Sequence, residues 1–270
     1  MLTLWLAVSA QAHDYLLAAE PPRRAGTTYT IHGVVAHARK REERRERPET
    51  LSRLDQVSRA GSEPLDADGH GWGRVDLPTD EVMAVVYENS GATVELEWPR
   101  FRAYVAKEGD PRVLDVVDAL GPETQHEHYR RSIKLLLGVA EGRPGWDRVV
   151  GQPLELVPLD RPGSVATMRV RLLAEGMPVT GAKVRAYPYG GHSEKHTVSA
   201  LTDEDGVATL RLSPKSDDWV YAAVTMTHDP DRAIPWSSVW TSLRVVELEW
   251  PRFRAYVAKE GDPRVLDVVD

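Results

Sequence analysis

Short segments with the composition or the two-residue period of β-strands dominate the first part of the chain. Residues 27–36 (TTYTIHGVVA) are rich in β-branched side chains, residues 92–98 (ATVELEW) alternate apolar and polar positions, and residues 81–89 (EVMAVVYEN) form a compact apolar run. Stretches rich in glycine, proline and polar residues separate them, as turns require. The pattern predicts an N-terminal β domain over residues 13–98.

The same pattern returns in the C-terminal part of the chain. Residues 166–188 predict a strand, a turn and a second strand, and residues 201–214 contain an Asp-Gly turn signal. Two more alternating or apolar segments follow at residues 217–228 and 237–245. About seven strands with frequent turns are typical of an immunoglobulin-like sandwich, which we expect over residues 151–245.

A helical period interrupts the two β regions between residues 99 and 150. Asp110 can cap a helix with Pro111 in its first turn. A second helix is predicted over residues 124–140, with an apolar stripe formed by Tyr129, Ile133, Leu136 and Leu137. The predicted fold is therefore mostly β, with two β-sandwich domains, the C-terminal one immunoglobulin-like, and a small helical insert over residues 99–150.

The start of the chain has the features of an export signal. An apolar run over residues 2–10 is followed by Ala10-Gln11-Ala12, which places small residues where a signal peptidase cuts. The run is shorter than the ~20 residues that a membrane span needs. We therefore expect a signal peptide over residues 1–12, a periplasmic or secreted protein that does not span the membrane, and His13 as the new first residue. The alternative is a buried N-terminal strand that is never cut.

The end of the chain repeats an earlier segment without a change. Residues 94–118 (VELEWPRFRAYVAKEGDPRVLDVVD) recur at residues 246–270. Structural repeats preserve a core pattern while their surfaces vary, and they need several copies to stack. We therefore interpret residues 246–270 as an appended copy without a function of its own.

Composition and motifs narrow the classes of function. The chain has no cysteine, so burial rather than disulfide bonds must stabilise an exported fold. The formal net charge of −7 argues against nucleic acid as a partner. The sequence contains no nucleophile elbow, phosphate-binding loop, H-E-x-x-H motif or dinucleotide fingerprint. These features do not favour an enzyme.

Several motifs resemble known families. Residues 176–184 (GMPVTGAKV) and 202–210 (TDEDGVATL) are similar to the G-x-P-[LV]-x-G-A-x-V and T-D-x-x-G pattern of carboxypeptidase-regulatory-like and related immunoglobulin-like domains. Other segments resemble the NikM-like domain-of-unknown-function family 4198: residues 12–17 (AHDYLL), 126–137 (HEHYRRSIKLLL), 151–162 (GQPLELVPLDRP) and 235–243 (PWSSVWTSL).

This resemblance implies a role in metal handling. Members of that family are exported bacterial proteins associated with the uptake of nickel and other metals. Their Ala-His-Asp start follows a signal peptide, and a histidine recurs after the penultimate strand; His13, Asp14 and His228 match these positions. An Asp-Trp-x-Ser motif near the end of the family is Pro235-Trp236-Ser237-Ser238 here, so the aspartate is absent.

An N-terminal histidine can hold a metal ion in a way that an internal one cannot. Its free amine and its Nδ1 atom bind one ion in a single chelate ring, and a second imidazole completes a three-nitrogen site suited to Cu(II) or Ni(II). His228 is the predicted second imidazole, because it shares the parity of the apolar residues of its strand. His32 and His37 have opposite parity, so at most one of them joins a site; His32 completes the predicted set with Asp14.

Three functions fit these observations. The first is a periplasmic accessory protein that binds a divalent transition metal, nickel or copper, with an envelope metal transporter as its partner. The second is a copper-dependent oxidative enzyme that uses the N-terminal histidine. The third is a non-metal immunoglobulin-like module of the cell envelope in which His13 only anchors the N-terminus.

Overall fold

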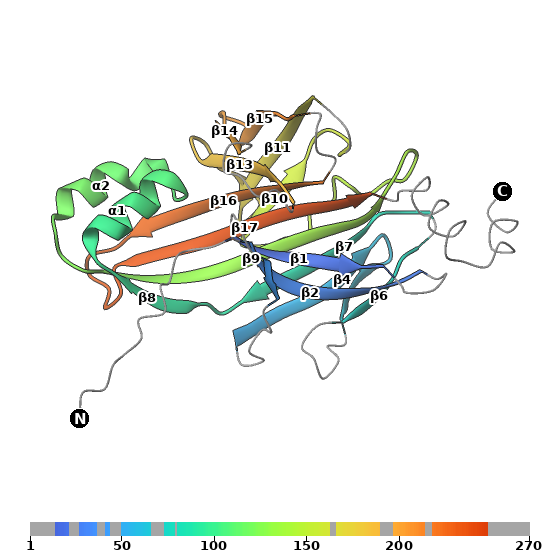
Figure 1. Cartoon of the computed structure of the whole chain (residues 1–270), viewed down its shortest axis with the longest axis horizontal. Helices are drawn as coiled ribbons and strands as arrows, with labels where there is room; N and C mark the ends of the chain where they lie inside the picture. The colour runs from blue at the N-terminus through green and yellow to red at the C-terminus, as the bar shows by residue number, and fades with distance from the viewer. Residues whose placement is uncertain are drawn as a thin grey trace, which may run out of the picture.

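The computed structural model confirms a mostly β fold with a small helical insert (Figure 1). It describes residues 14–21, 27–36, 41–43, 50–65, 73–78, 80–162, 166–189, 197–213 and 218–247. The predicted signal peptide, His13 and residues 248–270 of the appended copy lie outside the described residues.

A mixed nine-stranded sheet forms the centre of the molecule. Its strands pair along one path: β14 (Val198–Leu201), β13 (Lys183–Pro188), β16 (Trp219–His228), β17 (Trp236–Glu247), β9 (Gln125–Val139), β7 (Met83–Asn89), β4 (Leu51–Ser58) and β5 (Gly61–Pro64). The ninth strand, β8 (Ala92–Leu96), pairs with the first part of β9. Strands β17 and β9 are parallel, whereas the other neighbours in this sheet are antiparallel.

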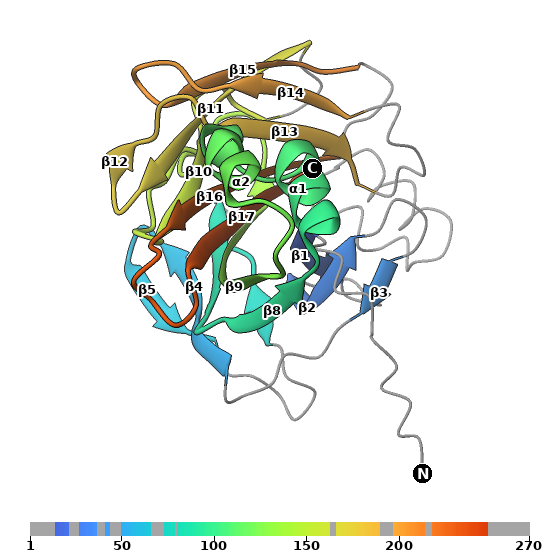
Figure 2. The ribbon, with the colours of Figure 1, turned by 90° about the vertical axis from the view of Figure 1, so that its left-hand side faces the viewer.

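Two smaller sheets cover opposite faces of the central sheet (Figure 2). The N-terminal sheet consists of β1 (Asp14–Glu20), β2 (Thr28–Ala36), β3 (Arg41–Glu43) and β6 (Arg74–Asp76). The C-terminal sheet consists of β10 (Leu154–Pro158), β11 (Thr167–Ala174), β12 (Met177–Pro178) and β15 (Val207–Arg211).

The middle strands of the central sheet are buried on both faces. In β7, Ala84 and Val86 pack into the core shared with the C-terminal sheet, while Val85 and Tyr87 pack into the core shared with the N-terminal sheet. All four side chains are fully buried. A strand covered on both sides has no polar face and reads as a continuous apolar run, as residues 81–89 do.

The predicted helix over residues 124–140 is wrong, because this segment is the 15-residue strand β9. Its second half, Ile133–Val139, is covered on both faces, and such a run has no two-residue alternation to distinguish it from a helix. In the described part of residues 99–150 and the residue before it, the helical elements are α1 (Trp98–Lys107), the 3-10 turn η2 (Pro111–Val113) and α2 (Leu114–Leu120). The helical insert is therefore shorter than the predicted 99–150.

Because residues 125–139 form strand β9, all three predicted segments (13–98, 99–150 and 151–245) contribute strands to the central sheet. The central sheet takes β4, β5, β7 and β8 from residues 13–98, β9 from residues 99–150, and β13, β14, β16 and β17 from residues 151–247. The two sandwiches thus share their middle layer.

Helices α1 and α2 pack on the last part of β16 and the first part of β17 (Figure 2). Asp110 accepts a hydrogen bond from the Arg112 backbone, as its predicted capping role requires. The apolar contact is formed by Phe101, Val105 and Val117 from the helices and by Val224, Met226, Trp236 and Trp240 from the strands. This contact makes the helical insert a fixed part of the core.

A buried carboxyl group lies beneath α1. Glu127 of β9 is only 2% exposed, and it accepts hydrogen bonds from Tyr104 Oη at 3.0 Å and from Ser238 Oγ. Burial raises the pKa of Glu127 above its ordinary value, while these donors act in the opposite direction. Neutral donors rather than a cation therefore satisfy this group.

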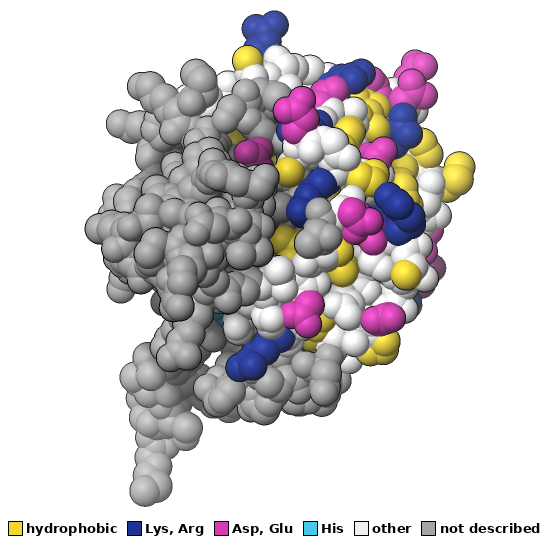
Figure 3. Space-filling model, turned by 90° about the vertical axis from the view of Figure 1, so that its right-hand side faces the viewer, with side chains coloured by type: hydrophobic (Ala, Val, Ile, Leu, Met, Phe, Trp, Pro, Cys, Tyr) yellow, Lys and Arg dark blue, Asp and Glu magenta, His cyan; other side chains and the backbone are white. Residues whose placement is uncertain are grey.

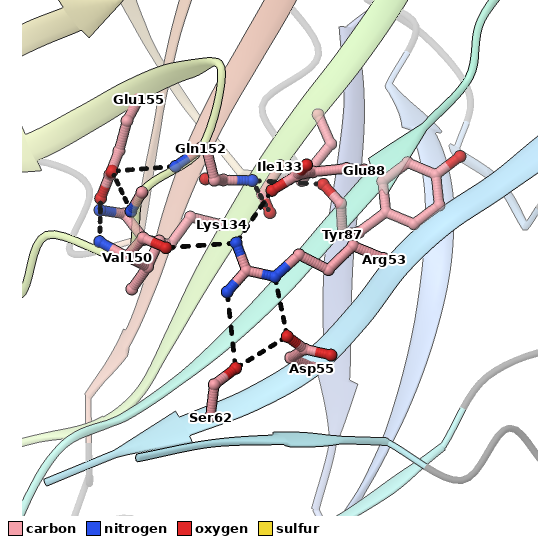
Figure 4. Close-up of polar contacts among 11 residues, drawn as sticks. Arg53, Asp55, Ser62, Tyr87, Glu88, Ile133, Lys134, Val150, Gln152 and Glu155 are labelled. Atoms are coloured by element: carbon pink, nitrogen blue, oxygen red, sulfur yellow. Dashed lines mark hydrogen bonds and ion pairs between the residues drawn. The ribbon is translucent and has the colours of Figure 1, made fainter. Parts of the chain in front are cut away.

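A buried ion pair joins β10 to β9 (Figure 4). Lys134 Nζ lies 2.6 Å from Glu155 Oε1, and each side chain is 1% exposed. The Glu155 carboxylate also accepts hydrogen bonds from the backbone N–H groups of Val150, Gly151 and Gln152. Close by, Arg53 bridges Asp55, Glu88, Ser62 and the Val150 carbonyl.

The described part of the chain has no membrane-spanning helix, and the face drawn in Figure 3 carries charges of both signs. None of its helices is long and apolar enough to cross a membrane. On that face Lys and Arg side chains are interspersed with Asp and Glu (Figure 3).

The two copies of the repeated sequence begin in different structural settings. Val94 lies in β8 opposite Glu127, whereas Val246 lies near the end of β17 opposite Leu137. The rest of the first copy forms the end of β8, the helices and η2. The same opening residues therefore serve two different strands.

Substitution Lys134→Met is expected to lower the free energy of unfolding by about 3–5 kcal/mol, because it leaves the Glu155 charge buried without its cation. Urea unfolding measures this loss. The control Lys107→Met removes a lysine whose side chain is 58% exposed and should change stability by less than about 0.5 kcal/mol. Equal, small effects of the two variants would contradict the buried pair.

Substitution Glu127→Gln is expected to flatten the dependence of stability on pH. A raised native pKa means that the native state binds this proton more tightly, so the group's contribution is largest below its unfolded pKa of about 4.3 and falls as the pH rises through the native pKa. Wild type should therefore lose stability relative to Glu127→Gln as the pH rises above about 4.3. Urea unfolding across this range tests it, with the exposed Glu123→Gln as control; parallel curves for wild type and Glu127→Gln would contradict it.

Candidate functional site

The first described residue, Asp14, is held in a buried ion pair. Its Oδ1 atom lies 2.8 Å from Arg185 Nη2, and the two side chains are 11% and 10% exposed. Asp14 begins β1 in the N-terminal sheet and Arg185 belongs to β13 in the central sheet. The pair joins residues that are 171 positions apart in the chain, so it fixes the start of β1 against the sheet.

Strand β1 is anchored to the central sheet immediately after Asp14. Ser242 Oγ of β17 donates a hydrogen bond of 2.7 Å to the Tyr15 carbonyl. The Tyr15 ring lies 5.4 Å from the Tyr87 ring, and the Arg131 guanidinium lies 5.0 Å from the Tyr15 ring centre. These contacts fix Tyr15, and with it the start of β1, on the central sheet.

The end of α1 brings a second carboxylate to this cluster. Lys183 of β13 donates a hydrogen bond of 2.9 Å to the Ala106 carbonyl, which fixes the last turn of α1 on β13. Glu108 follows that turn and lies close enough to Arg185 and Asp14 to feel both charges. Burial raises the pKa of Glu108, and Asp14 acts in the same direction while Arg185 opposes it.

Polar groups of β13 complete the cluster. Arg185 as a whole residue is only 8% exposed, and its Nε atom has no hydrogen-bond partner among the described residues. Burial, and then the negative charge of Asp14, raise the pKa of Tyr187 well above its ordinary value. We define the Asp14 cluster as Asp14, Glu108, Arg185 and Tyr187.

His228 lies in a different part of the sheet. Arg185 faces Ala222 across β13 and β16, and His228 is six residues further along β16, about 20 Å away. Asp110 holds the Met226 backbone N–H between the two positions, at 3.1 Å. The His228 ring packs on the Trp236 ring, with centres 4.6 Å apart. His228 therefore closes the apolar face of its strand rather than joining Asp14.

His32 is also separate from Asp14. It lies on β2 opposite Ala18, whereas Asp14 lies opposite Ala36 four residues along that strand. Its Nε2 atom lies 3.5 Å from Glu20 Oε1. No group of three or more His, Asp or Glu side chains within the described ranges is arranged to hold a metal ion. The predicted ligands Asp14, His32 and His228 are thus not brought together, and His13 lies outside the described residues.

His126 and His128 both lie in β9. Residues two apart in a strand point to the same face of the sheet, so these two side chains share a face. His126 is exposed and His128 is half-buried. His128 borders a shallow hollow with Arg232, Ala233, Ile234, Trp236 and Ser237.

Sequence analysis missed the two residues that most affect the setting of Asp14. Arg185 is a cation inside a buried strand (Lys183–Pro188), and such a residue needs a buried anion. A buried cation therefore predicts that an acidic residue lies beside it, but it does not indicate which acidic residue of the chain this is. Glu108 gave no signal, because only the packing of α1 on β13 brings it near β1.

Comparison with known proteins identifies the family. No curated protein matches the chain. A family model described as "Domain of unknown function (DUF4198)" matches residues 10–227, most of the chain. The matched region includes Asp14, Glu108, Arg185 and Tyr187, and it ends one residue before His228. The chain belongs to the DUF4198 family.

Proposed function

We propose that the processed protein, beginning at His13, binds a divalent transition metal of the nickel or copper type in the periplasm. Its role would be that of an accessory protein in metal uptake or handling, with an envelope transporter as partner. The α-amino group and Nδ1 of His13 would bind the ion in one chelate ring. Imidazole and amine nitrogens suit Cu(II) and Ni(II).

The observation that carries this proposal is the buried ion pair of Asp14 with Arg185. Residue 13 is bonded to Asp14, and consecutive Cα atoms are 3.8 Å apart. A new N-terminus at residue 13 would therefore extend from a residue that is clamped to two sheets. A chelating terminus gains affinity from such an anchor, because less conformational freedom is lost when the ion binds.

The proposal rests on the N-terminal residue rather than on a pair of histidines. His228 lies about 20 Å along β16 from Ala222, the residue that pairs with Arg185, and its ring packs on Trp236. The resemblance of the Ala-His-Asp start to exported metal-uptake proteins supports a role for His13 independently of His228.

Protein that begins at His13 is expected to bind Cu(II) or Ni(II), whereas the same chain with one extra N-terminal Met should bind at least about tenfold more weakly, because the amine that closes the chelate ring is displaced. Isothermal titration calorimetry of the two forms measures the difference. Binding should weaken as the pH falls below about 8, since the amine must lose its proton.

A matched control replaces His228, which should leave metal affinity within about twofold because the residue lies outside the proposed site. Equal affinity of the processed and Met-extended proteins would refute the proposal.

A further inference from the structure

Two histidines of β9 lie on a solvent-accessible face of the central sheet. His126 and His128 are two residues apart in the strand, so their side chains share a face. The other face of this part of the sheet is covered, because Leu96 of β8 and Trp236 of β17 pack into the core beneath α1 and α2. His126 is exposed and His128 is half-buried. The pair therefore lies at the end of the molecule where β8 and the two helices are found, on the face opposite the helices (Figure 1).

The strand register determines which residues surround the pair. Glu95 of β8 lies directly opposite His126, and Thr93 lies opposite His128. Residues paired in this way share a face and have Cβ atoms about 4.5–5.5 Å apart. Ser237 of β17 is the neighbour of His128 on its other side. Since Thr93 and Glu95 are both exposed, polar side chains and one carboxylate border the two imidazoles.

The His128 ring has space around it. A Cβ atom at Gly91 would lie 2.8 Å from His128 Cε1 and 2.9 Å from Arg130 Cγ, so glycine at this position leaves room for both side chains. Its φ of +95° also favours glycine. His128 in addition borders the shallow hollow beside Ser237. Rotation about its Cα–Cβ bond can therefore turn the ring toward His126.

These two imidazoles are less engaged than those of the other histidines that the structure describes. The His32 ring lies beside a carboxylate, and the His228 ring packs on an indole. Within the described ranges neither His126 nor His128 has a hydrogen-bond or ion-pair partner. A neutral imidazole has one ring nitrogen with a free lone pair, and this is the atom that binds a metal ion. Both rings are thus available as ligands.

We propose that His126 and His128 together bind one divalent transition metal ion on this face. Their Cα atoms lie about 6–7 Å apart along the strand. An ion bound to both rings holds the two ligand nitrogens within ~4 Å of each other, because each metal–nitrogen bond is ~2 Å long. Inward rotation of the two side chains provides this approach. Imidazole suits Cu(II), Ni(II) and Zn(II), water fills the remaining positions, and the neighbouring Glu95 carboxylate favours a cation. This site is separate from the N-terminus and does not depend on the proposed function of His13.

The test measures Cu(II) binding by a protein in which the N-terminal residue cannot contribute, namely the Met-extended form carrying His13→Ala. This parent protein should bind one Cu(II) ion, with affinity measured by competition against a chelator. His126→Ala and His128→Ala should each weaken binding at least about tenfold, since even the loss of an outer partner of a metal ligand has that effect. The control His32→Ala removes a half-buried imidazole of β2 and should change the affinity by no more than about twofold.

Electron paramagnetic resonance gives a second readout, because the nitrogen hyperfine splitting should report two imidazoles in the parent and one in each β9 variant. Thermal unfolding of the metal-free proteins shows that each variant is folded. Failure of the parent to bind Cu(II), or unchanged affinity and spectrum in both β9 variants, would overturn the proposal. Neither result bears on His13, whose metal binding is measured in the processed protein.

Discussion

The burial of the central sheet on both faces is the constraint on which the rest of the structure depends. Strands β7 and β9 have apolar side chains on each face, so a covering layer is needed on both sides. The N-terminal sheet covers one face and the C-terminal sheet covers the other. Helices α1 and α2 cover the part of β16 and β17 that extends beyond the N-terminal sheet. Since there is no cysteine, this layered burial must stabilise the protein without disulfide bonds.

The same layering creates the Asp14 cluster. Strand β1, the end of α1 and strand β13 meet on one face of the sheet, and each contributes a charged side chain there: Asp14, Glu108 and Arg185. Charges in such a place must be paired, because an isolated buried charge is costly. Arg185 pairs with Asp14, and this choice distinguishes the two carboxylates. The Asp14–Arg185 pair is thereby part of the framework that holds β1 against the central sheet.

Much of the fold could be predicted from the sequence, but the arrangement of its layers could not. Strands with one solvent-exposed face, such as residues 207–211, alternate apolar and polar positions, and this alternation can be recognised in the sequence. Strand β9 does not, because its second half is buried on both faces, and it was mistaken for a helix. The site residues differ in the same way. Asp14 follows from its place beside the predicted cleavage point, whereas Arg185 and Glu108 depend on contacts between residues that are far apart in the chain.

The central claim is that export frees His13 as the first residue, directly before the clamped Asp14. Intact mass measurement of the protein recovered from the periplasm or the medium, with sequencing of its first residues, tests this claim most directly. The account predicts a single form that begins His-Asp-Tyr. A mature protein with any other first residue, or one that retains residues 1–12, would contradict it.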